Sequence, residues 1–246
     1  IGLSADGPHS ITDKTRKTEN GMGAYSKIIH AMELLKKHDY IPSLSVTISE
    51  DVLRNQETVV EWLREMHLLF GIKDISYNLL HFQGEEFDKE KYSIAAGSFI
   101  IKSYKELGDI INDSRINRKI LSFTRSTFFY GDCAAITGNQ IVLKANGDIG
   151  LCQAFCQSNQ TTVGNIGVEK LSDIIEKAVI PALSKYKQFL PVFRKSCQGC
   201  DAIFACGGGC YWESNDCDRS CDVGYCQYSK ILHEWMLGCL DKQTTE

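Results

Sequence analysis

The distribution of cysteine constrains this chain more than any other feature of its sequence. All 11 cysteines of the 246 residues lie between Cys133 and Cys239, and the first 132 residues contain none. A change of this kind predicts a domain boundary, which we place between residues 125 and 126. The length suits one large domain or two small ones, and 43% hydrophobic residues are enough for real cores.

The first domain, residues 1–125, alternates strand and helix patterns. Apolar residues recur at three- and four-residue spacing in the helical stretches, as in amphipathic helices. Strands are expected over 1–5, 43–48 and 74–80, and helices over 25–37, 55–70 and 88–111. This order predicts parallel strands with right-handed crossovers. Three strands are too few for a closed barrel or a complete doubly wound sheet, so we expect the later half of an α/β domain.

The second domain, residues 126–246, has a different character. Strands over 140–143 and 149–151 flank an Asn-Gly hairpin turn, and residues 162–166 lead into a helix near 168–186. A last helix is expected around 225–240. The segment CQGCDAIFACGGGCYW, residues 197–212, has too few apolar residues to build a core alone. We therefore expect an inorganic or covalent group to organise it.

Spacing alone leaves three uses open for the cysteines. Disulfides require an oxidising compartment and are typical of small scaffolds, which an α/β chain of this length does not need. Structural zinc takes four ligands per ion, and the spacings allow it. Iron–sulfur clusters are also held by Cys thiolates, four per [4Fe–4S] cluster. The absence of a histidine near the cysteines favours clusters over zinc without deciding between them.

Charge and hydropathy exclude several kinds of partner. The chain has 27 Lys and Arg against 31 Asp and Glu, a net charge of -4 with no basic stripe, so we expect no nucleic-acid partner. No apolar run approaches the ~20 residues of a membrane span, so we expect no membrane partner. No secretory signal is recognisable, and we expect a cytoplasmic protein. Because the chain opens on Ile1 within a strand-like run, we expect its N-terminal end to have been trimmed.

Two motifs together resemble one family. The order Cys133-x13-Gly147-x4-Cys152, a gap, Cys197-x2-Cys200-x5-Cys206-x3-Cys210, a gap and a late cysteine resembles the SPASM domain of radical S-adenosylmethionine enzymes. The stretch from Ser4 to Arg16, which begins Ser-Ala-Asp-Gly-Pro-His, is similar to a strand and loop of the same enzymes' partial barrel. The resemblance covers nearly the whole chain.

The resemblance implies a fold and a set of cofactors. The fold class would be α/β, with the C-terminal half of a partial (β/α)6 TIM-like barrel followed by a small Cys-rich SPASM domain with a β-hairpin and helices. The cofactors would be S-adenosylmethionine and two auxiliary [4Fe–4S] clusters. These enzymes hold a third, catalytic cluster in a Cys-x3-Cys-x2-Cys motif ahead of the Ser-x-Asp-Gly strand. No cysteine precedes Cys133 here. We therefore expect a C-terminal portion whose third cluster lies upstream and which is inactive alone.

The resemblance also sorts the cysteines into two interleaved ligand sets. The first cluster would take Cys133, Cys152 and Cys210, with either Cys156 as the fourth ligand or one iron left open. The second would take Cys197, Cys200, Cys206 and a late cysteine, for which Cys226 fits the final gap best and Cys221 is the alternative. Cys239 fits a helix face and is expected to be a packed thiol.

In the first domain the resemblance places Ser4, Asp6 and Arg16 around the S-adenosylmethionine pocket, with Ser4 near the ribose. Their position at the end of a strand agrees with this. Asp6 is explained equally well by a turn at Asp-Gly-Pro. Arg16 could meet a carboxylate through two N–H groups or could be solvated, and we favour the solvated side chain. In the second domain, the run Gly207-Gly208-Gly209 would let backbone N–H groups approach a cluster, or it would form a flexible turn.

The function expected from the resemblance is peptide modification. A 5′-deoxyadenosyl radical would abstract hydrogen from a peptide or protein substrate, and a ferredoxin or flavodoxin would supply electrons. Sulfatase maturases carry an Asp immediately after the second cysteine as a proton acceptor, where this chain has Gln153. A maturase that forms a thioether or carbon crosslink is therefore favoured. The alternatives are an anaerobic sulfatase-maturase-like oxidase and a non-catalytic zinc- or cluster-binding module.

Overall fold

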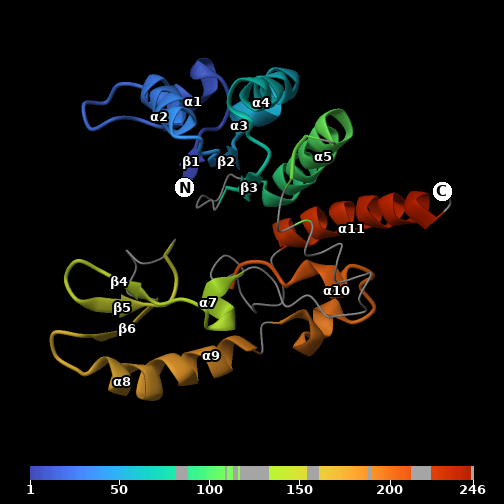
Figure 1. Ribbon diagram of the computed structural model, residues 1–246. Coiled ribbons are helices and arrows are strands. Elements are labelled where there is room, and N and C mark those ends of the chain that lie inside the picture. Colours follow the sequence, from blue (N-terminus) through green and yellow to red (C-terminus); the bar gives the residue numbers. More distant parts are fainter. Residues whose placement is uncertain are drawn as a thin grey trace. The chain divides into compact units, whose positions relative to one another are not determined.

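The structure is a computed structural model, and it describes residues 1–80, 88–108, 110–112, 116, 133–153, 161–187, 190–211 and 223–244. By their internal contacts the residues form two compact units. The first comprises Ile1–Thr124 and Ile231–Glu246, and the second comprises Arg125–Lys230 (Figure 1). The last 16 residues thus group with the first unit, although the sequence analysis assigned them to the second domain.

The first unit is built on a parallel sheet with the strand order β1-β2-β3. The strands are β1 (Gly2–Ser4), β2 (Ser43–Ile48) and β3 (Ile75–Leu79). The helices between and after them are α1 (His9–Thr15), α2 (Tyr25–Lys37), α3 (Glu50–Arg54), α4 (Gln56–Phe70) and α5 (Lys89–Leu107). The alternation predicted from the sequence is therefore confirmed as an α/β arrangement with parallel pairing.

Strand β2 shows why one face of this sheet is covered. Its residues alternate between fully buried and half-buried, with Leu44, Val46 and Ile48 on the buried face. Successive side chains of a strand point to opposite faces, so this face belongs to the core. The helices lie on one side of the sheet (Figure 1). They contribute the buried side chains Met32 from α2, Val59, Val60, Trp62, Leu63 and Met66 from α4, and Ala96, Phe99 and Ile100 from α5.

Two helices of the first unit were not expected. Helix α1 follows Pro8 directly and lies within the stretch interpreted as a loop. Helix α3 begins after Ser49, whose side chain accepts a hydrogen bond from the N–H of Val52 at 3.3 Å and so caps the first turn. The helix expected over 88–111 is shorter in the structure, where α5 ends at Leu107.

The second unit contains a small antiparallel sheet with the order β4-β5-β6. Its strands are β4 (Val142–Leu143), β5 (Asp148–Gly150) and β6 (Thr162–Asn165). The predicted hairpin is confirmed, with the N–H of Gly147 donating to the carbonyl of Lys144 at 2.9 Å. The pairing of β6 with β5 was not predicted. It places Asp148 opposite Asn165, and these residues belong to segments that are separate in sequence.

The helix predicted near 168–186 is present but is not uniform. It consists of α8 (Leu171–Ile174), a π-helical turn η2 (Ile175–Val179) and α9 (Ile180–Lys187). Pro181 explains the wider turn, because proline lacks an N–H and its ring would clash with a carbonyl one turn earlier in a regular α-helix. The wider turn accommodates Pro181 without ending the helix.

The remaining elements carry or surround the cysteines. They are α7 (Ala134–Thr137), the 3-10 turns η3 (Pro191–Phe193) and η4 (Lys195–Cys197), α10 (Ile203–Cys206) and α11 (Val223–Thr244). The part of α11 that groups with the first unit packs Trp235 against Tyr104, with ring centroids 5.2 Å apart. Among the helices that the structure describes, none has the length and apolar character required to cross a bilayer.

Gly23 illustrates how tightly the first unit is packed. A Cβ at this position would lie 2.0 Å from the carboxyl group of Asp13, which accepts a hydrogen bond from the N–H of Tyr25 at 2.7 Å and so caps α2. We expect Gly23→Ala to displace Asp13 and to lower the free energy of unfolding by about 1–2 kcal/mol, as the loss of a cap does. The urea midpoint measures this effect.

The matched control is Gly238→Ala, because a Cβ there meets nothing within 4 Å. Gly238 lies inside α11, where replacing glycine by alanine stabilises a helix by up to about 1 kcal/mol. The two substitutions should therefore shift the midpoint in opposite directions. A midpoint for Gly23→Ala equal to that of the unmodified chain would show that Asp13 has no capping role.

Candidate functional site

The first candidate site lies at the end of β1, where Asp6 is almost completely buried at 4% exposure. Arg16 approaches Asp6 with two nitrogens, Nε to Oδ2 at 2.9 Å and Nη2 to Oδ1 at 2.7 Å. The N–H of Thr47 donates to Oδ1 at 2.8 Å, and the hydroxyl of Thr15 donates to Oδ2 at 3.2 Å. The expectation of a solvated Arg16 is therefore wrong, because its guanidinium is held by a buried carboxylate.

These hydrogen bonds define what Asp6 does. A carboxylate has about four acceptor positions. Each carboxylate oxygen of Asp6 accepts two hydrogen bonds from within the protein. It thereby joins the end of α1, through Thr15 and Arg16, to β2, through Thr47. A planar two-point contact of this kind is geometrically specific. In this structure Asp6 holds the loop and orients Arg16, whose side chain is 27% exposed.

Thr12 was missed by the sequence analysis. Its hydroxyl donates to the carbonyl of Gly7 at 2.6 Å and accepts from the N–H groups of Asp6 and Gly7 at 3.1 and 3.2 Å. The side chain of one fully buried threonine therefore satisfies the backbone of the turn between β1 and α1. The available signal was a hydroxyl residue five positions after the Asp-Gly pair, where it can return to the turn's own backbone.

Ser4 belongs to a row of serines across the sheet. It pairs with Ser45, and Ser45 pairs with Ser76, so the three side chains share one face. Asn78, two residues further along β3, donates from Nδ2 to Oγ of Ser45 at 2.8 Å. The face opposite the apolar core thus carries hydroxyl and amide groups that are exposed or half-buried. Such groups suit a ligand rich in hydrogen-bonding atoms.

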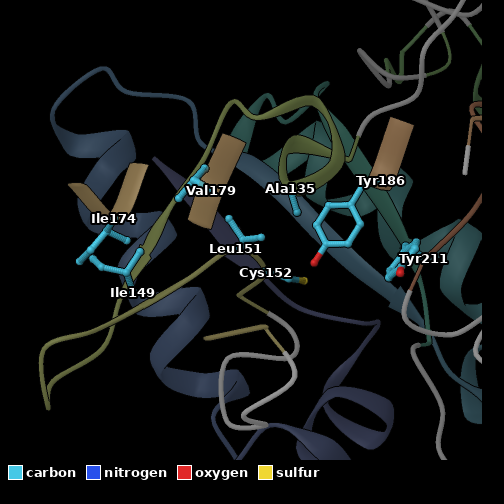
Figure 2. Packing of buried hydrophobic residues seen from close by; sticks show 8 residues of the cluster. All are labelled: Ala135, Ile149, Leu151, Cys152, Ile174, Val179, Tyr186 and Tyr211. Carbon is cyan, nitrogen blue, oxygen red and sulfur yellow. The ribbon is translucent and has the colours of Figure 1, made fainter. Parts of the chain in front are cut away.

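The second candidate site lies in the cysteine-rich unit, around one apolar cluster. Cys152 is buried in this cluster, and Cys133 and Cys210 pack against it. The cluster consists of Ala135, Ile149, Leu151, Cys152, Ile174, Val179, Tyr186 and Tyr211 (Figure 2). Residues from the hairpin, from the helix after β6 and from the segment after α10 therefore meet here. The three cysteines that the sequence analysis assigned to the first iron–sulfur site all contact this apolar cluster, and their assignment to one site remains a prediction.

Three of the cysteines assigned to the second cluster, Cys197, Cys200 and Cys206, lie in the short segment 197–206. Hydrogen bonds link its backbone, from the N–H of Cys200 to the carbonyl of Cys197 at 3.2 Å and from the N–H of Cys206 to the carbonyl of Ala202 at 2.9 Å. Burial raises the pKa of the Cys197 thiol, and the nearby Cys206 and Cys200 add to this, while the positive charge of Arg194 opposes it. Backbone hydrogen bonds therefore organise the short segment that carries these three thiols.

The remaining assigned cysteines are less closely connected. Cys226 lies on α11 within the second unit. Its sequence neighbours Tyr225 and Tyr228 have ring centroids 5.5 Å apart. Cys156 and Cys221 lie outside the described residues. The eight described cysteines form no disulfide bonds. Among the described residues, no three His, Cys, Asp or Glu side chains converge on one point as a single metal ion requires.

Curated relatives match almost the entire chain. In two Clostridium perfringens strains, a protein described as a cysteine-type anaerobic sulfatase-maturating enzyme is 25% and 24% identical over 250 residues. The match covers 96% of this chain, which spans 65% of the length of these relatives. An uncharacterized Synechocystis protein is 30% identical over 84 residues, 34% of this chain and 20% of that protein. No protein-family model matches.

Solved structures match the fold over the whole chain. Native anSMEcpe with bound AdoMet has a TM-score of 0.76 and 20% identity, covering 100% of this chain and 68% of that one. The same protein with bound AdoMet and Cp18Cys peptide has a TM-score of 0.76 and 20% identity, covering 100% and 69%. This chain therefore has the fold of the corresponding part of those structures.

Proposed function

We propose that this chain acts in a radical S-adenosylmethionine enzyme that modifies a peptide or protein. The observation that carries the proposal is the match of both compact units, over 96% of the chain, to sulfatase-maturating enzymes. The matching solved structures that contain AdoMet, with and without a peptide, support the choice of cofactor and substrate class. An electron donor of the ferredoxin or flavodoxin type and a cytoplasmic location are further parts of the proposal.

The polar face of the parallel sheet would bind S-adenosylmethionine. Ser4, Ser45 and Asn78 supply hydroxyl and amide groups there, which can hydrogen-bond to ribose or amino acid atoms. Arg16, held by Asp6, would present its remaining N–H groups to a carboxylate. S-adenosylmethionine bound here beside a four-iron cluster would supply the hydrogen-abstraction chemistry, with one electron from the reduced cluster and release of methionine.

The cysteine-rich unit would be a SPASM domain with two auxiliary clusters. Its donor set fits four-iron clusters, because soft thiolates suit iron and each thiolate can bind a different iron atom. Cys133, Cys152 and Cys210 would hold the first cluster, with Cys156 as the fourth ligand or with one iron open. Cys197, Cys200 and Cys206 would hold the second, completed by Cys226 or Cys221. The gathering of the first three around one apolar cluster supports this division.

Two kinds of substrate modification remain as candidates. Similarity to the Clostridium perfringens enzymes favours oxidation of a single residue in a sulfatase. Gln153 favours crosslinking instead, because an amide cannot act as a proton acceptor near neutral pH, and Gln153 is exposed next to Cys152. The proposal therefore commits to a peptide or protein substrate and gives crosslink formation as its finer form.

Mass spectrometry of peptides from the native host separates the two modifications. Cells with the intact gene are compared with cells that lack it, so that the protein acts in its natural form. A crosslink joins two residues and suppresses fragmentation between them, whereas oxidation of a single residue leaves fragmentation complete. A product oxidised at one residue of a sulfatase would exclude the crosslinking form, and no difference between the two strains would exclude both.

Residues 1–246 alone are expected to form no 5′-deoxyadenosine when reduced by dithionite with S-adenosylmethionine. The compact unit that carries Ser4 and Asp6 contributes no thiolate from residues 1–132, and carboxylates or hydroxyls replace soft sulfur ligands poorly at such a cluster. Chromatography against added authentic 5′-deoxyadenosine sets the detection limit. Product above background would contradict the assignment of the two cysteine sets to auxiliary clusters.

A further inference from the structure

Arg194 is a charged residue buried inside the cysteine-rich unit. It is 8% exposed, although arginine is rarely buried to this extent unless it is paired. Nη2 donates to the carbonyl of Gly208 at 3.0 Å. Removing a cation from water costs several kcal/mol in folded proteins, so its position requires favourable interactions nearby.

Arg194 joins both ends of the proposed ligand segment. Its carbonyl accepts from the N–H of Cys197 at 3.0 Å, so the residue begins the turn that ends on the first thiol. Its guanidinium reaches Gly208, two residues after the last thiol, Cys206. The positive charge therefore lies at the closure of the segment that contains Cys197, Cys200 and Cys206.

The glycines after Cys206 make this approach possible. Gly207, Gly208 and Gly209 have φ of 70°, 98° and 78°, a left-handed backbone that favours glycine. A Cβ on Gly208 would lie 2.9 Å from Nη2 of Arg194 and 3.0 Å from Cδ of Pro191. The loop thus presents its backbone and leaves space for the guanidinium. Packing around Arg194 therefore explains the glycine at position 208, and the positive φ angles explain the glycines at 207 and 209.

We infer that Arg194 is a positioning residue that raises the reduction potential of a four-iron cluster held by residues 197–206. The inference depends on the proposed function, because it requires the second auxiliary cluster. Reduction adds one electron to the cluster, and a nearby positive charge favours the more negative form. Net charge, hydrogen bonds and exposure are the factors that set the potentials of such clusters.

The test is a potentiometric titration of the anaerobically reconstituted chain, with dithionite as reductant and spectroscopic detection of the reduced cluster. The titrations use a Cys152→Ala background, in which only the second cluster is expected. We expect Arg194→Gln to lower the ratio of reduced to oxidised cluster about tenfold at a fixed potential, equivalent to about 59 mV for one electron. Lys195→Gln is the matched control, because it removes one positive charge from an exposed neighbour, and it should leave the ratio unchanged.

Arg194→Lys separates charge from packing. It keeps the positive charge but loses the planar guanidinium, so full iron content with an unchanged potential supports the inference even if Arg194→Gln folds poorly. A tenfold fall in the ratio of reduced to oxidised cluster in Arg194→Lys would overturn the inference. Full iron content with an unchanged potential in Arg194→Gln would also overturn it. Absence of iron from the parent protein would instead overturn the proposed function, so the two failures are distinguishable.

Discussion

Replacing Cys206 by alanine is expected to remove about half of the bound iron, because Cys206 is one of the four thiolates proposed to hold the second four-iron cluster. The thermal stability of the protein should fall as well. Cys206 is buried at 9% exposure at the end of the four-residue helix α10, and the surrounding segment has few apolar residues to hold it. Metal binding is then part of the folding free energy of this unit. Iron analysis and thermal unfolding of the reconstituted protein measure the two effects.

Cys239→Ala provides the matched control for Cys206→Ala. Cys239 is a half-buried thiol on α11 and belongs to the compact unit that contains the parallel sheet. Its replacement should leave the iron content unchanged. Thermal stability of Cys206→Ala equal to that of the parent, with one cluster missing, would show that the second cluster does not contribute to folding.

Asp6→Ala is expected to destabilise the first unit by about 3 kcal/mol, the lower end of the range for breaking a buried ion pair, since Arg16 is 27% exposed. The substitution leaves a guanidinium without its carboxylate and removes the acceptor of the Thr47 N–H. Urea unfolding followed by tryptophan fluorescence measures the change, because Trp62 is buried in this unit.

The control for Asp6→Ala is Glu61→Ala, which removes an exposed partner of Arg64 on α4. Exposed ion pairs contribute about 0–1 kcal/mol, so the midpoint should change little. Equal effects of the two substitutions would mean that the buried contact between Asp6 and Arg16 is no more important than a surface pair. That result would remove the structural role assigned to Asp6.

Hydropathy patterns predicted most of the first unit, because local periodicity determines which residues face a core. Helix α2 and strand β2 have the predicted bounds, Tyr25–Lys37 and Ser43–Ile48. The contacts of Asp6 were not predictable in the same way. They depend on Thr47, 41 residues away, which reaches Asp6 only after β1 and β2 have paired. Tertiary pairing of this kind has no local signal.

The second unit was predictable mainly through its cysteines. Their spacing indicated a cofactor-organised segment, and the resemblance divided them into two sets, but neither identified the apolar cluster around Cys152. That cluster depends on the π-helical turn near Pro181 and on the position of Tyr211 beside Tyr186, with ring centroids 4.5 Å apart. The burial of Arg194 and its contact with Gly208 were also missed, since an arginine before a cysteine has no distinctive pattern.

The central claim, that two interleaved sets of thiolates hold two four-iron clusters, is tested most directly by metal and sulfide analysis after anaerobic reconstitution. We predict about eight iron atoms per chain with equivalent acid-labile sulfide, a brown colour and no zinc, as two four-iron sites require. A plateau near four iron atoms would contradict the presence of two clusters. Stoichiometric zinc in a colourless protein would contradict the enzyme proposal and favour a structural zinc module.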